Sequence, residues 1–496
     1  MFKIKDFSPR KYQEVIAKTA ADYNTLIILP TGLGKTKTAI LAAIDRLNSH
    51  PNTQILFLPP TKPLSSQIRK EFIKNTNIEE EFISLLTGAI TPKKRKDIFS
   101  KSKVIIATPQ TIQKDLENNR ISLEDVSLLV IDEAHRSREN FANTKVASFY
   151  KKQSQYPRII ALTASPGGSR EKINEICKNL FIEKVEIRDE HHEEVSEFVK
   201  KKDIKWVEVS LPKEMKDIHK RIKSVYKSKL KELPKLGFNK PLSITNKTDL
   251  LKLQSQFRRE IEKKNQIAYY GISLTSHLIK LDFLLELLET QGLGAVQKYW
   301  VKLNAENSKA AKAIVNNVEI KKAVEISDKL IKNNVKHPKL LMLRNILKEE
   351  SKNKVIVFTN YRDTIEEILN FLREDPEIKP LKLIGQKLGL SQKEQVDIIK
   401  KFEKEEYNVL ICTSIGEEGL DILGASLAIF YDSVPSEIRA IQRAGRVGRL
   451  SAGRIIQLIT KDTREQGYYW SAKRKEKTMR SILKKMQDST LLSKWK

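Results

Sequence analysis

The sequence has few cysteines, and this scarcity argues against both a disulfide-stabilised domain and a zinc-stabilised domain. Only Cys177 and Cys412 occur among the 496 residues. Neither has further cysteines or histidines at the spacing of a zinc site. A disulfide framework and a structural zinc site are therefore both unsupported, and a reducing compartment fits the composition.

Long apolar segments are also missing. No part of the chain approaches the ~18 consecutive apolar residues that a membrane-spanning helix needs. The first residues, MFKIKDFSPRKYQ, carry charges where a signal peptide requires an apolar stretch. We therefore expect a cytoplasmic protein with no membrane partner.

Acidic residues are scarce relative to basic ones. The chain has 62 Asp and Glu against 91 Lys and Arg, which gives a net charge of +29 and a pI of about 9.7. An excess of this size favours a polyanionic partner or surface. The length exceeds what one hydrophobic core usually holds, so about three domains are expected.

Two parts of the chain alternate short β-branched segments with amphipathic ones. The first part contains TLIILP, QILFLPP, KVIIATP, LLVIDE and RIIALTAS, and the second contains KVIVFTN, LKLIG, NVLICTS, LAIFYD and RIIQLIT. This alternation is typical of parallel βαβ units, whose functional loops follow the carboxyl ends of the strands. The sequence therefore predicts two α/β domains.

The segment between these domains has a 3.6-residue periodicity and few strand-like stretches, so a helical insert is expected there. Residues 211–340 contain 27 Lys or Arg and 13 Asp or Glu, a net charge of +14 and about half of the total. A solvated surface explains any single lysine there, whereas nucleic-acid contact explains the whole excess better. The basic helix SAKRKEKTMRSILKKMQ near the carboxyl end is expected to pack back on a domain.

Pairs of basic residues in the insert are candidate contacts to nucleic-acid phosphates. They fall within about one and a half helical turns of each other. These residues are Arg258, Arg259, Lys263 and Lys264. The nearby Tyr269 and Tyr270 are expected in the core of the insert.

A glycine-rich turn, LPTGLGKT at residues 29–36, lies between a predicted strand and a predicted helix. Such a turn aims backbone N–H groups and the positive end of the helix at phosphates. Lys35 would reach the β and γ phosphates of a nucleotide, and Thr36 would ligate Mg²⁺. The strict phosphate-loop pattern has glycine where this chain has Leu29, so a glycine turn without a chemical role stays open.

Two carboxylates follow the apolar strand in LLVIDEAH. Carboxylates are costly at the end of a buried strand unless a cation or a reaction uses them. Asp132 would hold Mg²⁺ and Glu133 would polarise an attacking water. An ordinary acidic loop is the alternative, and a phosphate loop about 100 residues upstream disfavours it.

A third cluster, IQRAGRVGR at residues 441–449, interleaves three arginines with glycines. Glycine costs about 1 kcal/mol in a helix interior, so an ordinary surface helix is a poor explanation. The guanidinium group is always charged and binds carboxylates or phosphates with its planar fork. Arg443, Arg446 and Arg449 are therefore expected to face an anion.

These motifs, in this order, resemble those of the superfamily 2 DEAH-type helicases over nearly the whole chain. The matching stretches are RKYQ, PTGLGKT, PPTKPLSSQ, TPQT, DEAH, TAS, IVFTNYRDT, TSIGEEGLDI and QRAGRVGR. The resemblance implies an α/β protein with two RecA-like parallel-sheet motor domains, at residues 1–203 and 337–496. A basic, thumb-like helical insert would occupy residues 204–336. ATP and Mg²⁺ are the implied cofactors, and a shortened glycine loop is common in this family.

The resemblance also assigns roles around the nucleotide. Arg446 and Arg449 would be arginine fingers acting on the γ-phosphate in cis, and Gln442 would help to position the water. Gln13 would pair with adenine, Arg10 would stack on the base, and Asp421 would approach the ribose. The remaining residues of the implied phosphate loop are Thr31, Gly32 and Gly34.

Other polar residues of these motifs are implied to follow the phosphates of one nucleic-acid strand without reading its bases. They are Thr61, Thr108, Asn360 and Thr413. Thr163 and Ser165 would link the ATP and nucleic-acid sites. Simple helix capping remains an alternative for each of these residues.

The helical insert, with GLSQKEQ before YNVLICTSIGEEGLDI, most resembles the archaeal fork-structure-specific helicase-nuclease family and the Fanconi anaemia complementation group M helicases. This resemblance implies ATP-driven processing of forked or Holliday-type DNA by a nucleoid-associated protein. No second catalytic domain follows, so a separated helicase portion, or a member without the nuclease, is expected. An RNA-directed ATPase or helicase and an ATP-driven nucleic-acid clamp that does not unwind remain alternatives.

Overall fold

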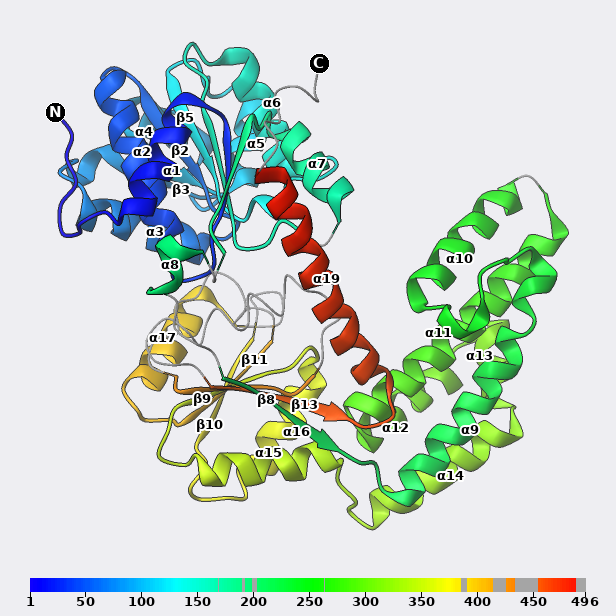
Figure 1. The fold of residues 1–496 in the computed structure, drawn as a ribbon. Coiled ribbons are helices and arrows are strands. Elements are labelled where there is room, and N and C mark those ends of the chain that lie inside the picture. Colours follow the sequence, from blue (N-terminus) through cyan, green and yellow to red (C-terminus); the bar gives the residue numbers. More distant parts are fainter. Residues whose placement is uncertain are drawn as a thin grey trace.

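The computed structural model of the protein contains two parallel β-sheets and a helical arm (Figure 1). The structure describes residues 1–167, 169–189, 192–198, 203–262, 264–384, 390–413, 425–432 and 454–487. Within this part of the chain, no helix is long and apolar enough to cross a membrane.

The first sheet has seven parallel strands in the order β3-β4-β2-β5-β6-β1-β7. Its strands are β1 (Thr25–Ile28), β2 (Gln54–Leu58), β3 (Ile83–Leu86), β4 (Val104–Ala107), β5 (Val126–Ile131), β6 (Ile159–Thr163) and β7 (Lys184–Ile187). Its helices are α1 (Lys11–Asp22), α2 (Lys35–Ser49), α3 (Lys62–Asn75), α4 (Pro92–Lys101), α5 (Pro109–Glu117), α6 (Ala142–Gln153), α7 (Arg170–Asn179) and α8 (Glu193–Ser196). Separate apolar clusters cover the two faces of the sheet, because alternate side chains of each strand point to opposite faces. The five predicted strands are all present.

In the described residues, the second sheet has six parallel strands in the order β10-β11-β9-β12-β13-β8. Its strands are β8 (Asp203–Val209), β9 (Val355–Phe358), β10 (Pro380–Leu383), β11 (Val409–Cys412), β12 (Leu427–Phe430) and β13 (Arg454–Thr460). Its helices are α15 (Pro338–Glu349), α16 (Arg362–Leu372) and α17 (Gln392–Glu403), and α19 (Arg464–Gln487) follows the last strand.

Strand β8 corrects one boundary of the sequence analysis. We placed residues 204–209 in the helical insert, but β8 pairs with β13 along its whole length and forms an edge of the second sheet. Most side chains of this strand are exposed, including Ile204 and Trp206. A strand of this kind lacks the continuous apolar run that marks a buried parallel strand, which is why the sequence did not reveal it.

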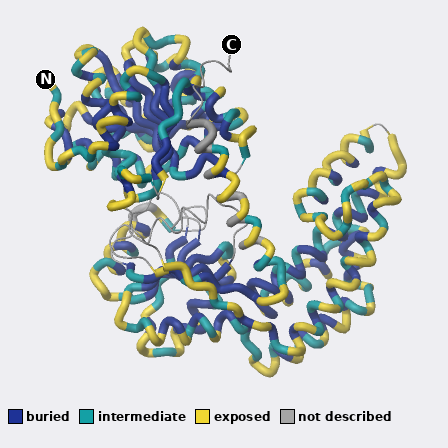
Figure 2. Tube along the Cα trace, viewed as in Figure 1, coloured by how far each residue is buried: buried dark blue, intermediate teal, exposed yellow. Residues whose placement is uncertain are grey.

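The arm is built only from helices in its described residues. They are α9 (Lys213–Leu230), α10 (Lys247–Glu262), α11 (Gln266–Thr290), α12 (Leu293–Asn304), α13 (Lys309–Val315) and α14 (Val318–Lys332), with single turns at Leu233–Leu236 and Leu242–Ile244. One apolar cluster fills the base of the arm and a second fills its tip, and α11 contributes to both. Figure 2 shows these buried positions along the inside of the arm. At the tip, a Cβ on Gly271 would lie 2.6 Å from the Phe257 ring, so glycine permits the close approach of α10 and α11.

A charged cluster fixes the arm to the second domain. Arg464, at the start of α19, pairs with Asp282 (3.1 Å) and Glu289 (2.8 Å) of α11. The Thr460 hydroxyl donates to the Glu289 carbonyl oxygen. Beside this cluster, the fully buried Lys339 and Glu465 form an ion pair of 2.6 Å. Because the Arg464 contacts join α11 to the second domain through largely buried charges, the arm and the second domain are expected to move as one body.

Helix α19 crosses from the second domain to the first (Figure 1). Met479, near its end, is buried in the core of the first domain, and Ile482 packs against that core. The expectation that this basic helix packs back on a domain is therefore confirmed. The contact is with the first domain, whereas the sequence boundaries assigned the helix to the second.

His337, at the joint between the arm and α15, is expected to make stability depend on pH. Its buried ring accepts a hydrogen bond from the Lys339 backbone N–H (3.2 Å) and so caps α15. Burial, and then the charge of Lys339, lower its pKa from 6.5 to about 3. The unfolded chain protonates this ring below pH 6.5 and the folded chain does not. This residue should therefore make the folded chain progressively less stable as the pH falls from 6.5 towards 3, by roughly 1 kcal/mol per pH unit.

Chemical denaturation at several pH values tests this expectation with His337→Asn, which keeps a capping oxygen but does not titrate. The variant should lose stability less steeply than the unmodified chain below pH 6.5. Identical slopes would show that His337 is not responsible.

Candidate nucleotide and nucleic-acid site

The glycine loop between β1 and α2 brings the start of α1 against the start of α2. Gly34 has a φ of 74°, and a Cβ at this position would lie 2.5 Å from Gln13 Nε2. Gln13 Nε2 donates to the Leu33 carbonyl (3.4 Å), and the Tyr12 hydroxyl donates to the same oxygen (2.7 Å). Glycine is thus needed both for the left-handed backbone and for the close approach of Gln13.

Lys35 and Asp132 meet at the carboxyl edge of the first sheet. Lys35 is the first residue of α2, and its Nζ donates to the Leu29 carbonyl (3.1 Å). Asp132 directly follows β5 and is only 8% exposed. Burial, and then the charge of Glu133, raise the pKa of Asp132 to about 6, and Lys35 partly opposes this shift. A buried carboxylate beside a lysine can hold a cation whose other ligands come from phosphates.

The donors at this edge fit Mg²⁺ better than a transition metal. Thr36 supplies a hydroxyl on the first turn of α2, and Asp132 supplies a carboxylate. Within the described residues, no group of three or more His, Cys, Asp and Glu could hold a metal by itself. Mg²⁺ is commonly bound through one or two carboxylates together with substrate phosphates and water.

Glu133 has an unusual backbone and a defined set of neighbours. Its φ is 50°, and its N–H donates to Asp132 Oδ1 (2.9 Å). His135 Nδ1 lies 3.3 Å from Glu133 Oε2 and 3.3 Å from Thr163 Oγ1. The Ser165 N–H donates to Thr163 Oγ1, and the Ser165 hydroxyl contacts the Met479 sulfur (3.1 Å). A continuous set of contacts therefore runs from Glu133 to α19.

Arg10 occupies the edge of the loop where the resemblance expects adenine. Its Nη1 donates to the Tyr12 hydroxyl (3.1 Å), and its backbone N–H donates to Gln13 Oε1 (3.0 Å). The Arg10 Cζ lies 4.0 Å from the centre of the Phe198 ring. Gln13 is 3% exposed and already bonds through both ends of its amide. Each amide end retains capacity for a further hydrogen bond.

The residues expected to follow nucleic-acid phosphates lie after parallel strands. Thr61 follows β2 and Thr108 follows β4 in the first sheet, while Asn360 follows β9 and Thr413 follows β11 in the second. Thr61 and Thr108 stand at helix N-cap positions, but neither side chain accepts the capping hydrogen bond. Thr108 Oγ1 instead bonds Thr111 Oγ1 (3.0 Å). Helix capping thus explains why these two threonines stand at N-cap positions, but their hydroxyl groups do not make the capping hydrogen bond.

Asp432 supports the loop of Asn360 and was missed in the sequence analysis. Its buried carboxylate accepts hydrogen bonds from the Thr359 hydroxyl (2.6 Å) and the Asn360 N–H (2.7 Å). The signal for it was the acid in LAIFYD, which comes two residues after the end of an apolar strand. This carboxylate fixes the backbone of the loop after β9.

A second feature that the sequence analysis missed is a surface cavity of about 490 Å³ beside Thr111. It is lined by Gly88, Ala89, Ile90, Thr91, Pro92, Arg95, Gln110, Thr111 and Lys114. Arg95 is held by Asp115 through two contacts of 2.6 Å. The only sequence signal was the LLTG stretch after a short strand, which we did not single out.

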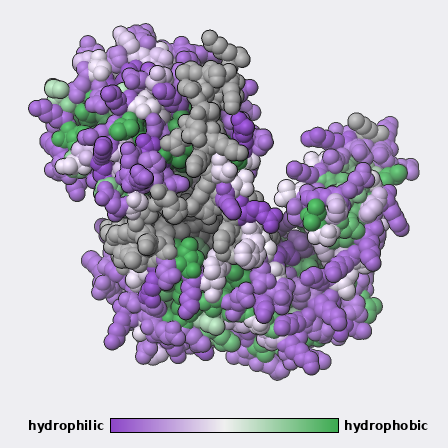
Figure 3. All heavy atoms as spheres, in the orientation of Figure 1, coloured by the Kyte–Doolittle hydropathy of each residue, from purple (hydrophilic) through white to green (hydrophobic). Residues whose placement is uncertain are grey.

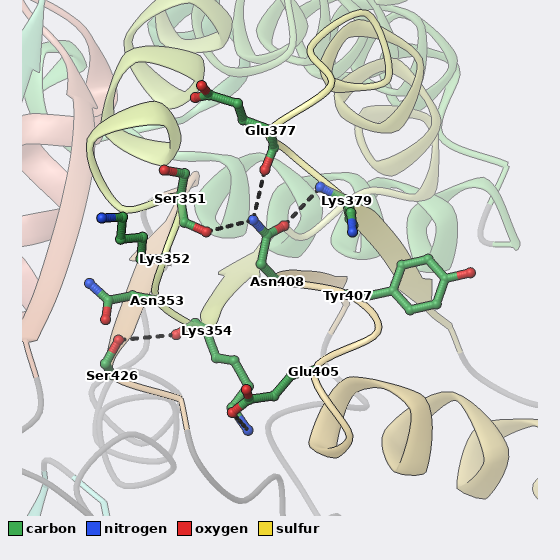
Figure 4. A pocket seen from close by; sticks show the side chains of 10 residues that line it. All are labelled: Ser351, Lys352, Asn353, Lys354, Glu377, Lys379, Glu405, Tyr407, Asn408 and Ser426. Carbon is green, nitrogen blue, oxygen red and sulfur yellow. Dashed lines mark hydrogen bonds and ion pairs between the residues drawn. The ribbon is translucent and has the colours of Figure 1, made fainter.

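A cavity of about 420 Å³ lies at the opposite edge of the second sheet (Figure 4). Lys354, Lys379, Asn408 and Ser426 stand directly before four of the strands. Asn408 bonds the Ser351 and Glu377 carbonyls and the Lys379 N–H, so it ties the strand starts together. Its place at the amino ends of the strands separates this cavity from the loops that carry the motifs.

Five residues of the expected site, and one of the insert, lie outside the described residues. They are Asp421, Gln442, Arg443, Arg446, Arg449 and Lys263. Their roles stay predictions from the sequence.

The tip of the arm carries exposed basic residues. Arg258 and Arg259 are exposed near the end of α10, and Lys264 is exposed just before α11. The expectation that Tyr269 and Tyr270 are core residues was wrong, because they are 60% and 50% exposed. Ala268 and Gly271 are the buried residues of this part of α11, and Gly271 packs against Phe257 of α10. Both tyrosines therefore lie on the exposed side of α11.

Three family models match successive parts of the chain. The model described as "DEAD/DEAH box helicase" matches residues 10–173. The model described as "Putative ATP-dependent RNA helicase, helical bundle" matches residues 214–337. The model described as "Helicase conserved C-terminal domain" matches residues 338–451. Their order corresponds to the first domain, the arm and the second domain.

Individual proteins match over nearly the whole chain. The crystal structure of the Pyrococcus furiosus Hef helicase domain shares 42% identity with a TM-score of 0.72, over 93% of this chain and 98% of that one. "Putative ATP-dependent RNA helicase MJ1505" of Methanocaldococcus jannaschii is 39% identical, over 98% of this chain and 62% of the relative. "ATP-dependent DNA helicase fml1" of Schizosaccharomyces pombe is 33% identical, over 92% of this chain and 57% of the relative. The chain thus spans less than two thirds of these two curated relatives. With both motor domains and the helical arm matched, it belongs to the superfamily 2 DEAH-type helicases, in the family of the Hef helicase domain and the Fanconi anaemia complementation group M type helicases.

Proposed function

We propose that the chain is the motor of an ATP-dependent DNA helicase or translocase that acts on forked or Holliday-type branched DNA. One observation carries the proposal: the arm with its basic tip is fixed to the second motor domain by the cluster of Arg464, Asp282 and Glu289. A DNA segment held by the tip would therefore move with that domain whenever it shifts relative to the first.

The proposed chemistry is ATP hydrolysis at the edge of the first sheet. Lys35 binds the β and γ phosphates, and the backbone N–H groups of the glycine loop bind the phosphates beside it. Thr36 and Asp132 hold Mg²⁺, which neutralises charge on the phosphates when bound. Glu133 orients the attacking water and accepts its proton. The arrangement of Lys35, Asp132 and Glu133 around one sheet edge supports these roles.

Two sets of residues would couple hydrolysis to domain motion: the arginines of the second domain, and the contacts that lead from Glu133 to α19. Arg446 and Arg449 of the second domain would stabilise charge on the γ-phosphate, so ATP would favour closure and phosphate release would remove that preference. The contacts from Glu133 through His135, Thr163 and Ser165 to α19 offer a second connection between nucleotide and domains.

The proposed path of one DNA strand runs over the carboxyl ends of both sheets. Thr61 and Thr108 would contact phosphates on the first domain, and Asn360 and Thr413 on the second. Contacts of this kind do not distinguish a fork from a plain single strand, so junction preference needs a further surface. The exposed Arg258, Arg259 and Lys264 at the arm's tip are suited to a duplex segment, and open space separates the tip from the first domain (Figure 3).

The choice of DNA rests on the relatives that are named DNA helicases. An RNA-directed ATPase is the second candidate, because one similar protein and the matched helical bundle carry RNA helicase names. ATPase stimulation by forked DNA, linear duplex DNA and duplex RNA separates the two. Stronger stimulation by forked DNA supports the proposal, whereas stronger stimulation by duplex RNA contradicts it. A strand-displacement assay identifies a clamp that hydrolyses ATP without unwinding.

The role of the arm is tested by replacing Arg258, Arg259, Lys263 and Lys264 with Ala. Basal ATPase should remain, while binding to forked DNA should weaken. Each lost phosphate contact should reduce the slope of log affinity against log salt by about 0.9. The measurement is binding to forked and single-stranded DNA at several salt concentrations.

A matched control replaces four lysines of α14, at the base of the arm, and removes the same charge. They are Lys321, Lys322, Lys329 and Lys332. Equal losses in both variants would indicate a general effect of net charge. An unchanged salt slope and fork preference in the tip variant would place junction recognition elsewhere.

A further inference from the structure

The segment between the two sheets contacts the nucleotide-binding edge of the first domain. Helix α8 lies in this segment, and its Val195 is fully buried in the core that contains Tyr12 of α1. Glu194 pairs with Arg188 (2.6 Å), which directly follows β7. The Val195 contact holds α8 against α1, and the ion pair holds α8 to the end of β7. Phe198 follows two residues after α8 and lies beside Arg10.

The Phe198 ring lies against the Arg10 guanidinium. The Arg10 Cζ lies 4.0 Å from the ring centre, which is within the range of a cation–π contact. The same guanidinium donates to the Tyr12 hydroxyl, and that hydroxyl donates to Leu33 of the glycine loop. Arg10 is therefore held by contact with the ring and by a hydrogen bond that leads to the phosphate loop.

A planar guanidinium can stack on an aromatic ring, and Phe198 supplies a ring within contact distance of Arg10. A planar group that is held in place loses little conformational freedom when a base stacks on its other side. An arginine without such support would have to be ordered at the moment of binding, which costs affinity.

We propose that Phe198 is a positioning residue for the nucleotide base, because it holds the Arg10 guanidinium flat so that adenine stacks on the opposite side. Phe198, in the connection between the two motor domains, then forms part of the ATP site. This inference rests on the proposed ATPase function. Phe198 is 38% exposed, and nothing in the motif pattern assigns it a role.

The test compares binding of ATP with binding of inorganic tripolyphosphate, which has phosphates but no base. Phe198→Ala should weaken ATP binding roughly tenfold, since a cation–π contact and base stacking are both affected. Tripolyphosphate affinity should not change. Phe198→Tyr, which keeps an aromatic ring, should restore ATP affinity, and Phe198→Leu should not.

A double-mutant cycle with Arg10→Ala shows whether the two residues act together. In the Arg10→Ala background, Phe198→Ala should have little further effect on ATP binding. Additive losses, or equal weakening of ATP and tripolyphosphate, would overturn the inference and indicate a purely structural role. If the unmodified chain binds ATP and Phe198→Ala binds it equally well, only this inference fails. An unmodified chain that binds no ATP overturns the proposed function as well.

Discussion

Lys35→Ala and Glu133→Gln are expected to abolish ATP turnover for different physical reasons. Lys35 supplies the positive charge at the glycine loop, and its loss should weaken phosphate binding and reduce turnover by on the order of 10³. Glu133→Gln keeps the shape of the side chain but cannot accept a proton, so turnover should fall by about 10²–10⁴. The measurement is steady-state ATP hydrolysis with saturating forked DNA, together with nucleotide binding.

The two variants should differ in binding. Glu133→Gln should still bind ATP and accumulate the ATP-bound state, whereas Lys35→Ala should not. Lys18→Ala and Glu14→Gln on the exposed side of α1 are matched controls that remove the same groups from solvent-exposed positions. Substantial hydrolysis by either active-site variant would contradict the assignment.

Replacing Arg446 or Arg449 with Ala should reduce turnover by on the order of 10³ while affecting ATP affinity less. The segment with these arginines connects β12 to β13, two neighbouring parallel strands of the second sheet. An arginine contributed by one domain to a phosphate bound on the other acts mainly in the transition state, where charge develops on the γ-phosphate. The rate of single-turnover hydrolysis should therefore fall much more than the affinity for ATP.

Lysine variants sharpen this prediction. Arg446→Lys should rescue poorly, because an ammonium group lacks the planar fork that binds two oxygens. If Arg446→Ala hydrolyses ATP normally but lowers the temperature of unfolding, the arginine is structural. The two-domain mechanism would then lose its main support.

The sequence predicted those parts of the candidate site in which a short motif directly follows a strand. Gly34, Lys35 and Asp132 stand where the βαβ pattern predicts, since a parallel strand brings the residues after it to one edge of the sheet. Tyr269 and Tyr270 were misplaced because the first part of α11 packs through small residues, Ala268 and Gly271. Periodicity counts large apolar residues, so it assigned the wrong side of the helix to the core.

Contacts between residues far apart in the chain explain the other differences. Arg464 meets Glu289 and Met479 meets Ser165 across 175 and 314 positions. No local pattern in the sequence signals either contact.

The sequence by itself determined the order of the motifs, the two α/β domains and the helical, basic character of the arm. Each of these depends on residues close together in the chain, where strand and helix periodicity act. The tertiary structure alone decided that β8 joins the second sheet, that the arm is fixed to the second domain and that α19 reaches the first. It also placed Phe198 on Arg10. These features depend on which surfaces of separately formed units fit together, and packing between distant segments leaves no periodic trace in the sequence.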